Sequence, residues 1–195
     1  MSKAKPITNG IGMIIVVGPS GVGKSTLVDK ITAEYPILFD TVTCTTRPMR
    51  KGEREGVPYH FMSEERFREL MAQDYFVEWA QVHNKLYGTP RIQIDGAMAE
   101  GRIVIMDVDV QGARTFRAKY PNSYAVFILP PSIDELRHRI KKRDKMEDHE
   151  LELRLENARK ELAQAGEYDA QIINADVNQS YEQFKKIVEE IVKNR

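Results

Sequence analysis

The stretch Gly18-Pro-Ser-Gly-Val-Gly-Lys-Ser25 follows the short apolar run Met13-Ile-Ile-Val-Val17 and leads into a segment of helical composition. The apolar run is mostly β-branched and bounded by glycines, which is typical of a strand buried on both faces of a parallel sheet. The glycine-rich stretch matches the phosphate-loop pattern G-x-x-x-x-G-K-[ST], in the place where that loop occurs, between a buried strand and a helix. This order predicts a three-layer α/β domain of the P-loop NTPase type, with a central parallel sheet and right-handed crossovers.

The residues of this loop indicate what it binds. Glycines let backbone N–H groups turn inward around an anion, and the N-terminus of the following helix adds partial positive charge. The Lys24 side chain can reach the β- and γ-phosphates, and the Ser25 hydroxyl can ligate Mg²⁺. A phosphate loop alone leaves kinase, GTPase and ATPase activities open, and a glycine-rich turn with an exposed lysine is the structural alternative. The predicted nucleotide-binding residues are Gly18, Pro19, Ser20, Gly21, Val22, Gly23, Lys24, Ser25 and Thr26.

A carboxylate on a second strand is the expected metal partner of the loop. Asp107 comes directly after the apolar run 103–106, the position from which a Walker-B-type carboxylate reaches Mg²⁺ directly or through water. Asp109 lies two residues further on. Either aspartate can instead cap the turn before Gly112, as loop aspartates commonly do. The predicted metal residues are therefore Ser25 and Asp107.

Outside one middle region the chain alternates buried strands with helices. Pro130-Pro131 and the capping box Ser132-Ile-Asp-Glu135 open a basic helix that runs toward Arg143. Two later helices carry apolar stripes, which we assign to packing. Residues 38–90 hold short alternating segments, a small helix and scattered glycines, which predicts an inserted β-rich subdomain. We expect four parallel strands at 13–17, 103–106, 125–129 and 171–173, a core at about 11–37 and 91–195, and a frayed leader at 1–10.

Composition bounds the class of protein. The chain has 195 residues, enough for one domain with a real core. Lys+Arg and Asp+Glu both number 29, and this zero net charge does not suggest a nucleic-acid coat or a polybasic membrane anchor. The single cysteine, Cys44, excludes an internal disulfide framework and fits a reducing compartment. With no apolar run near 18 residues, we expect a cytoplasmic protein with no membrane, nucleic-acid or obligate protein partner.

A second group of cations and hydroxyls lies in the middle region. Thr45-Thr-Arg47-Pro-Met-Arg50-Lys-Gly-Glu-Arg54 is rich in turn formers and positive charge. A second anion site in this segment would face the first across a cleft, and two anion sites indicate phosphoryl transfer between nucleotides. Taken alone, such a charge run is also compatible with a solvated loop.

At these residues the chain resembles the guanylate kinase family, which transfers the γ-phosphoryl group of ATP to GMP. The resemblance implies a kinase that makes GDP and ADP, accepts dGMP as well, uses Mg²⁺ with ATP, and binds GMP on the inserted subdomain at about 38–90. It runs from about Met13 to Val192 and rests on Gly18–Ser25, Thr45-Thr-Arg47 with Arg50, Gly56-Val-Pro-Tyr-His-Phe61, Phe76-Val-Glu-Trp-Ala80, Tyr87-Gly-Thr89, Asp107-Val-Asp-Val-Gln-Gly112 and Pro130-Pro-Ser132.

The resemblance also implies how GMP is recognised. Arginines and tyrosines of the subdomain hold the GMP phosphate, while two threonines and a glutamate read the guanine. Guanidinium groups bind phosphate in bidentate fashion, and a carboxylate accepts from the guanine N1–H and 2-amino group, which adenine lacks. The phosphate residues are Arg47, Arg50, Tyr59 and Tyr87, the guanine residues are Thr43, Glu78 and Thr89, and Asp109 completes the GMP-binding set.

The remaining cations fit a helical lid at about 137–156. The resemblance aligns Arg143 and Arg154 with arginines that close over the ATP phosphates, and it aligns Asn174 with an adenine-side asparagine. Arg139 joins the ATP-binding set, although an exposed basic helix also explains a surface arginine. The predicted catalytic residues are Lys24, Arg47, Arg143 and Arg154.

Several positions depart from the family pattern. Thr43 and Thr89 stand where many members have serine, which keeps the hydroxyl. Asp144 follows the lid arginine where glycine or asparagine is frequent, and Ala175 stands where an aspartate is common. Beside Glu78, Trp79 is expected to be a core aromatic.

Two other functions stay open. Guanylate-kinase-like scaffold modules bind phosphoprotein partners and have lost the phosphate loop, whereas this chain keeps Gly18–Ser25 and has Cys44 where those modules tend to carry proline. We expect Cys44 to pack beside the site rather than react. A small-molecule kinase that phosphorylates a ribose phosphate would not need Thr43, Glu78 and Thr89 together.

Overall fold

The chain folds around two sheets, and the computed structural model describes residues 4–57, 59–82, 84–143 and 146–195. The parallel sheet has the strand order β2-β7-β1-β8-β9, and the second sheet has the order β4-β3-β6-β5. In chain order the elements are β1 Met13–Val17, α1 Lys24–Glu34, β2 Leu38–Asp40, β3 Thr43–Thr45, β4 Tyr59–Phe61, α2 Glu64–Ala72, β5 Phe76–Val82, β6 Lys85–Pro90, α3 Arg91–Ala99, β7 Ile103–Val108, α4 Val110–Lys119, β8 Ser123–Leu129, α5 Ile133–Arg143, α6 Asp148–Leu162, the 3₁₀ turn η1 Ala165–Glu167, β9 Ala170–Ile173 and α7 Val177–Lys193.

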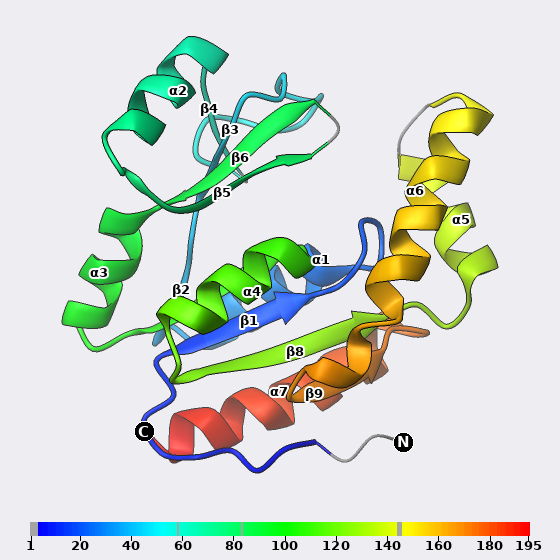
Figure 1. Ribbon diagram of the computed structural model, residues 1–195. Coiled ribbons are helices and arrows are strands. Elements are labelled where there is room, and N and C mark those ends of the chain that lie inside the picture. The colour runs from blue at the N-terminus through cyan, green and yellow to red at the C-terminus, as the bar shows by residue number, and fades with distance from the viewer. Residues whose placement is uncertain (1–3, 58, 83, 144–145) are drawn as a thin grey trace.

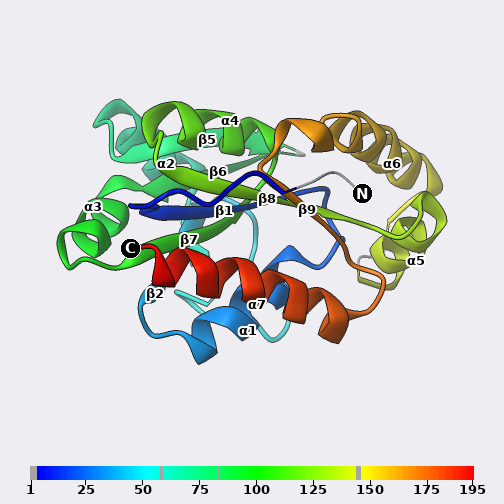
Figure 2. The same cartoon turned by 90° about the horizontal axis from the view of Figure 1, so that it is seen from below.

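The five-stranded sheet is the middle layer of the predicted three-layer α/β domain. Every residue of β1 is buried, as expected for a central strand that is covered on both faces. The hydrophobic cluster on one face takes side chains from α1, α5, α6 and α7. The cluster on the other face takes them from α3, α4 and η1. Figure 2 shows α1 and α7 on one side of the sheet and α4 on the other, which confirms the predicted layers.

The four expected parallel strands are all present, and a fifth joins them. β2 pairs in parallel with β7 at the edge of the sheet. The inserted subdomain was predicted to begin at about residue 38, so that boundary is wrong, because Leu38–Asp40 belongs to the main sheet. Only Leu38 of the three is buried and Asp40 is exposed, so this short edge strand has no apolar run by which the sequence could reveal it.

The second sheet carries the middle region and is covered by α2. β3 pairs in parallel with β4 and antiparallel with β6, which pairs antiparallel with β5. Phe67 from α2 stacks on Phe76 with ring centroids 4.5 Å apart. A Cβ at Gly88 would lie 2.9 Å from both rings, so glycine is required under this stack. Cys44 is buried in the same cluster, as expected for a packing residue.

Trp79 corrects one expectation. Its side chain is 50% exposed, so it is not a core aromatic. The reason is its position, since β5 is the edge strand of the second sheet, and the cluster under α2 does not include Trp79 within the described residues.

Two projections flank the carboxyl end of β1, as Figure 1 shows: the second sheet with α2, and the pair α5–α6. The serine half of the predicted capping box is confirmed, because Ser132 Oγ accepts from Glu135 N at 3.1 Å where α5 begins. The Glu135 carboxylate accepts from Arg139 along the helix. The lid predicted at 137–156 falls on this helix pair, but residues 144 and 145, including the family departure at Asp144, lie outside the described residues. Within the described residues, no helix is long and apolar enough to cross a membrane.

Candidate functional site

The phosphate loop connects β1 to α1 and has the backbone that its glycines were expected to provide. Gly18, Gly21 and Gly23 have φ of 144°, 84° and 100°, in the region that favours glycine. A Cβ at Gly18 would lie 2.5 Å from the carbonyl oxygen of Ile128. The loop therefore lies against the end of β8, and only glycine allows that approach.

Lys24 points back over this loop. Its Nζ donates to the carbonyl oxygens of Gly18 at 2.6 Å and Pro19 at 3.2 Å. Burial lowers the pKa of Lys24, while the carboxylates of Asp107, Glu161 and Asp109 favour its charged form. This is a partly desolvated cation in the place where an anionic ligand of the loop would bind.

The two predicted metal residues meet at the same edge. Ser25 Oγ donates to Asp107 Oδ2 at 2.7 Å, which joins the start of α1 to β7. Burial of its carboxyl, followed by the charges of Asp107 and Asp29, raises the pKa of Asp40 to about 7. The edge therefore offers hydroxyl and carboxylate oxygens, the ligands that Mg²⁺ prefers. Within the described ranges no three His, Cys, Asp or Glu residues are grouped to hold a metal ion by themselves.

The lid cations reach the phosphate loop to different extents. Arg143, at the end of α5, donates from Nη2 to Ser20 Oγ at 2.8 Å, so one predicted catalytic arginine lies directly on the loop. Arg154 donates to Glu150 at 2.7 Å and Arg139 to Glu135 at 2.8 Å, each one turn along its own helix. These two pairs hold Arg154 and Arg139 along the helices of the lid.

Asn174 lies behind the phosphate loop. Its Nδ2 donates to the carbonyl oxygen of Val22 at 2.8 Å, and the residue is 4% exposed. A Cβ at Gly23 would lie 2.4 Å from that nitrogen. Asn174 therefore supports the loop from the β9 side, and its predicted contact with adenine stays a prediction.

The predicted phosphate residues of the second sheet lie around Arg47. The Arg47 guanidinium lies 5.2 Å from the ring centroid of Tyr59, and that ring lies 5.9 Å from the ring of Tyr87. Both terminal nitrogens of Arg47 donate to Glu53, at 3.0 and 2.8 Å. Glu53 also accepts from the backbone N of Arg50 at 2.7 Å. The fold therefore brings together the four expected residues and adds a carboxylate, Glu53.

Sequence reasoning missed Glu53 as a site residue. The signal available was a single acidic residue inside a basic run, six positions after Arg47. Arg47 and Glu53 become a bidentate pair only through the turn of the loop between them. A phosphate that pairs in forked fashion with these two terminal nitrogens would take the place of the Glu53 carboxylate, which has the same forked geometry.

The predicted guanine residues also lie together. Glu78 pairs with Thr89 across β5 and β6, and Thr89 Oγ1 donates to Glu78 Oε1 at 3.3 Å. Burial raises the pKa of Glu78 to about 7, and the charge of Asp109 adds to this effect. Thr43 lies on β3, the strand next to the β6 strand of Thr89, and is opposite Tyr59 of β4.

Asp109 links this pair to the core domain. Its side chain accepts from Gly112 N at 2.8 Å and caps the start of α4. A Cβ at Gly112 would lie 3.6 Å from Glu78 Oε2 and 3.5 Å from Asp109 Oδ1. The start of α4 therefore forms one wall of the Glu78 site. The capping role that the sequence left open for Asp109 is confirmed, and its predicted contact with GMP stays a prediction.

The two halves of the site influence each other electrostatically. Burial raises the pKa of Tyr59 to about 12, and Asp107 is the largest charge that adds to the rise. Asp107 lies on the core sheet and Tyr59 on the second sheet. The Asp107 carboxylate, which is bonded to Ser25 at the start of α1, therefore lies close enough to Tyr59 of the second sheet to interact with it electrostatically.

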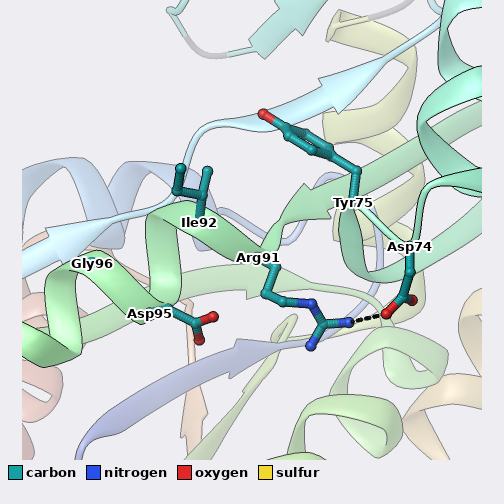
Figure 3. Close-up of a pocket in the computed structure, with 6 residues that line it drawn as sticks. All are labelled: Asp74, Tyr75, Arg91, Ile92, Asp95 and Gly96. Carbon is teal, nitrogen blue, oxygen red and sulfur yellow. Dashed lines mark hydrogen bonds and ion pairs between the residues drawn. The ribbon is translucent and has the colours of Figure 1, made fainter.

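A cavity of about 380 Å³ lies away from these residues, where the second sheet joins α3. Figure 3 shows Arg91 extending toward Asp74 beside this cavity, and the two side chains form an ion pair at 3.1 Å. The lining of the cavity contains no predicted site residue. It consists of Asp74, Tyr75, Arg91, Ile92, Asp95 and Gly96. We therefore assign this cavity to the junction rather than to substrate binding.

The matches to known proteins cover most of the chain. The family model for guanylate kinase matches residues 11–191. A curated guanylate kinase from Bdellovibrio bacteriovorus is 47% identical over 180 residues, covering 92% of this chain and 97% of its own length. Another from Nitratidesulfovibrio vulgaris is 42% identical over 173 residues, covering 89% and 84%. The crystal structure of guanylate kinase from Anaplasma phagocytophilum superimposes with a TM-score of 0.74 at 28% identity, covering 93% of this chain and 86% of that one.

Proposed function

This chain belongs to the guanylate kinase family, and from that premise we propose which of its residues serve each substrate. The reaction transfers the γ-phosphoryl group of ATP to GMP and gives ADP and GDP. An oxygen of the GMP phosphate attacks the γ-phosphorus, and the bond from that phosphorus to the β–γ bridging oxygen breaks. Because most of the catalysis in such a transfer comes from positioning and charge stabilisation, cations are the residues to assign first.

On the ATP side we assign the loop 18–26 to the triphosphate. Lys24 has to exchange the carbonyl oxygens of Gly18 and Pro19 for phosphate oxygens, and its partial desolvation supports that exchange. Arg143 supports the developing negative charge from the lid, since it already contacts Ser20 of the loop. We place Arg154 and Arg139 with it in the lid at about 137–156, and Asn174 behind the loop on the adenine side.

Mg²⁺ fits the donor set at the end of β7. Ser25 and Asp107 would hold it, because their oxygens lie 2.7 Å apart and are ligands that Mg²⁺ prefers. When bound, the ion supplies charge neutralisation between the β- and γ-phosphates. The carboxyl of Asp40 also interacts with the charges of Asp107 and Asp29, which add to the effect of burial in raising its pKa, so three carboxyl groups lie near this edge.

On the GMP side the Glu78–Thr89 pair is the observation that carries the assignment. A half-buried carboxylate with one hydroxyl partner at 3.3 Å can accept from the N1–H and 2-amino group of guanine. AMP has no matching donors, so it would leave this carboxylate unsatisfied. We assign the GMP phosphate to Arg47, Arg50, Tyr59 and Tyr87, and the base to Thr43, Glu78, Thr89 and Asp109.

The assay that tests this function measures ADP release with GMP, dGMP, AMP and ribose phosphates as acceptors. We expect turnover with GMP and with dGMP, because the assigned residues contact the base and the phosphate rather than the 2′-hydroxyl. AMP should be poor by as much as about 10⁴-fold, the range for a site built on hydrogen bonds to the preferred substrate. Preference for a ribose phosphate, or phosphopeptide binding without turnover, would contradict the assignment. The buried free thiol of Cys44 supports a reducing, cytoplasmic location.

A further inference from the structure

The strand that carries Glu78 is interrupted by a bulge. Phe76 pairs with Pro90 and Glu78 with Thr89, so two steps along β5 match one step along β6. Val77 is the extra residue, and a residue in this position is left outside the ladder of the sheet. Bulges also re-aim the neighbouring side chain. The direction of the Glu78 carboxylate therefore depends on how the bulge is held.

Two contacts hold Val77 against the core domain. Its side chain is 1% exposed and belongs to the core cluster that contains α3 and α4 rather than to the cluster under α2. Its carbonyl oxygen accepts a hydrogen bond from Lys119 Nζ. Lys119 is the last residue of α4, so this bond ties the bulge of the second sheet to a helix of the first.

The same helix touches Glu78 at its other end. Gly112, in the first turn of α4, lies beside Glu78 Oε2, which would be in ordinary contact, at 3.6 Å, with a Cβ at that position. Lys119 is also the cation whose charge favours the ionised form of Glu78. Helix α4 therefore meets the segment 77–78 at two points: the Lys119 side chain at its C-terminus bonds the Val77 carbonyl oxygen, and its first turn lies beside the Glu78 side chain.

We propose that Lys119 is a positioning residue for guanine recognition, which holds the β5 bulge against α4 and thereby keeps the Glu78 carboxylate in register with Thr89. The inference rests on the proposed assignment of Glu78 to guanine. A carboxylate that receives two donors from one base must be placed closely, and a shift of about 1 Å in such a contact can cost about 10²-fold in rate. AMP makes no use of this carboxylate, so loss of Lys119 should lower the selectivity for GMP.

The test compares kcat and KM for GMP and AMP in Lys119→Met, Lys119→Arg and the parent protein. Methionine keeps an unbranched chain but has no donor, and arginine restores a charged donor. Lys186→Met is the matched control, because it removes one lysine from an exposed position on α7. Glu78→Gln and the double variant Lys119→Met/Glu78→Gln complete a cycle, which isolates the coupling between the two residues.

We expect Lys119→Met to raise the KM for GMP and to lower the GMP:AMP ratio of kcat/KM by about tenfold, below the 10²-fold limit above. The KM for ATP and the rate of the Lys186→Met control should stay within about twofold, and Lys119→Arg should recover most of the loss. In the Glu78→Gln background, Lys119→Met should change the ratio by less than about twofold, because its effect passes through Glu78.

The outcomes separate this inference from the function on which it rests. An unchanged GMP:AMP ratio in Glu78→Gln would overturn the guanine assignment of Glu78, and the inference with it. A lower ratio in Glu78→Gln together with an equal loss toward GMP and AMP in Lys119→Met would overturn the inference alone. The inference alone would also be overturned if Lys119→Met lowers only the melting temperature, or if Lys119→Arg fails to restore the GMP:AMP ratio.

Discussion

Binding of GMP in the absence of ATP should strengthen as the pH rises through neutrality, and Glu78 is the cause. Burial, followed by the charge of Asp109, raises the pKa of Glu78 to about 7 in the free protein. The N1–H and 2-amino group of guanine are both donors, so only the ionised carboxylate can accept from both. A protonated Glu78 must therefore lose its proton before GMP is fully bound.

The size of the effect follows from the ionised fraction. With a pKa of about 7, about one carboxyl in eleven is ionised near pH 6 and about ten in eleven near pH 8. The apparent dissociation constant is the intrinsic constant divided by the competent fraction. GMP should therefore bind about tenfold more tightly near pH 8 than near pH 6, and at about pH 7 binding should release about half a proton.

Isothermal titration calorimetry of GMP over this pH range, in buffers that differ in ionisation enthalpy, measures both quantities. The GMP phosphate also titrates, with a pKa near 6, and Glu78→Gln is the control that isolates its contribution. Asp109→Asn should shift the transition to lower pH, because the second cause of the raised pKa is removed. If the parent protein and Glu78→Gln share one pH dependence, Glu78 does not meet the base as a carboxylate.

Four further substitutions test the donor site, the lid, the GMP-phosphate site and the charge of Asp40. Lys24→Ala should abolish most activity while GMP still binds, because Lys24 serves the transferred group; turnover near the parent rate would refute the donor-site assignment. Arg143→Ala should lower kcat by about 10²–10³-fold with little change in the equilibrium Kd for GMP, whereas Arg47→Ala should weaken GMP binding as well; stopped-flow kinetics and GMP titration separate the two. Asp40→Asn should stabilise the protein near pH 8, by less than the full shift in pKa implies, because the Asp40 residue is exposed at the edge of the sheet and water screens its charge. The pKa of Asp40 is raised to about 7 by burial, so the carboxyl stabilises the fold below its unfolded pKa and this contribution is lost as the pH rises through 7. The gain in melting temperature should shrink as the pH falls toward about 4, and a gain that is independent of pH would contradict this cause.

The sequence alone predicted those elements whose structure depends on residues that are close together in the chain. The strand Met13–Val17, the glycines of the loop and the start of α1 follow one another within 15 residues or so, and each is specified by its own residue types. The capping box at Ser132 is local in the same way, since donor and acceptor lie three residues apart. For these elements, backbone preference and the burial pattern agree with the fold, so the phosphate loop could be located from the sequence alone.

Tertiary structure decided every feature that depends on a distant partner. β2 is a strand because β7 pairs with it, and Trp79 is exposed because β5 became an edge of the second sheet. The hydrogen bond from Lys119 to Val77 joins helix α4, which packs on the first sheet, to strand β5 of the second, and it spans 42 positions of the chain. Hydrogen bonds and burial between such segments depend on which surfaces meet after folding. The type of a residue and its neighbours in the chain do not determine those contacts, so they could not be predicted from the sequence.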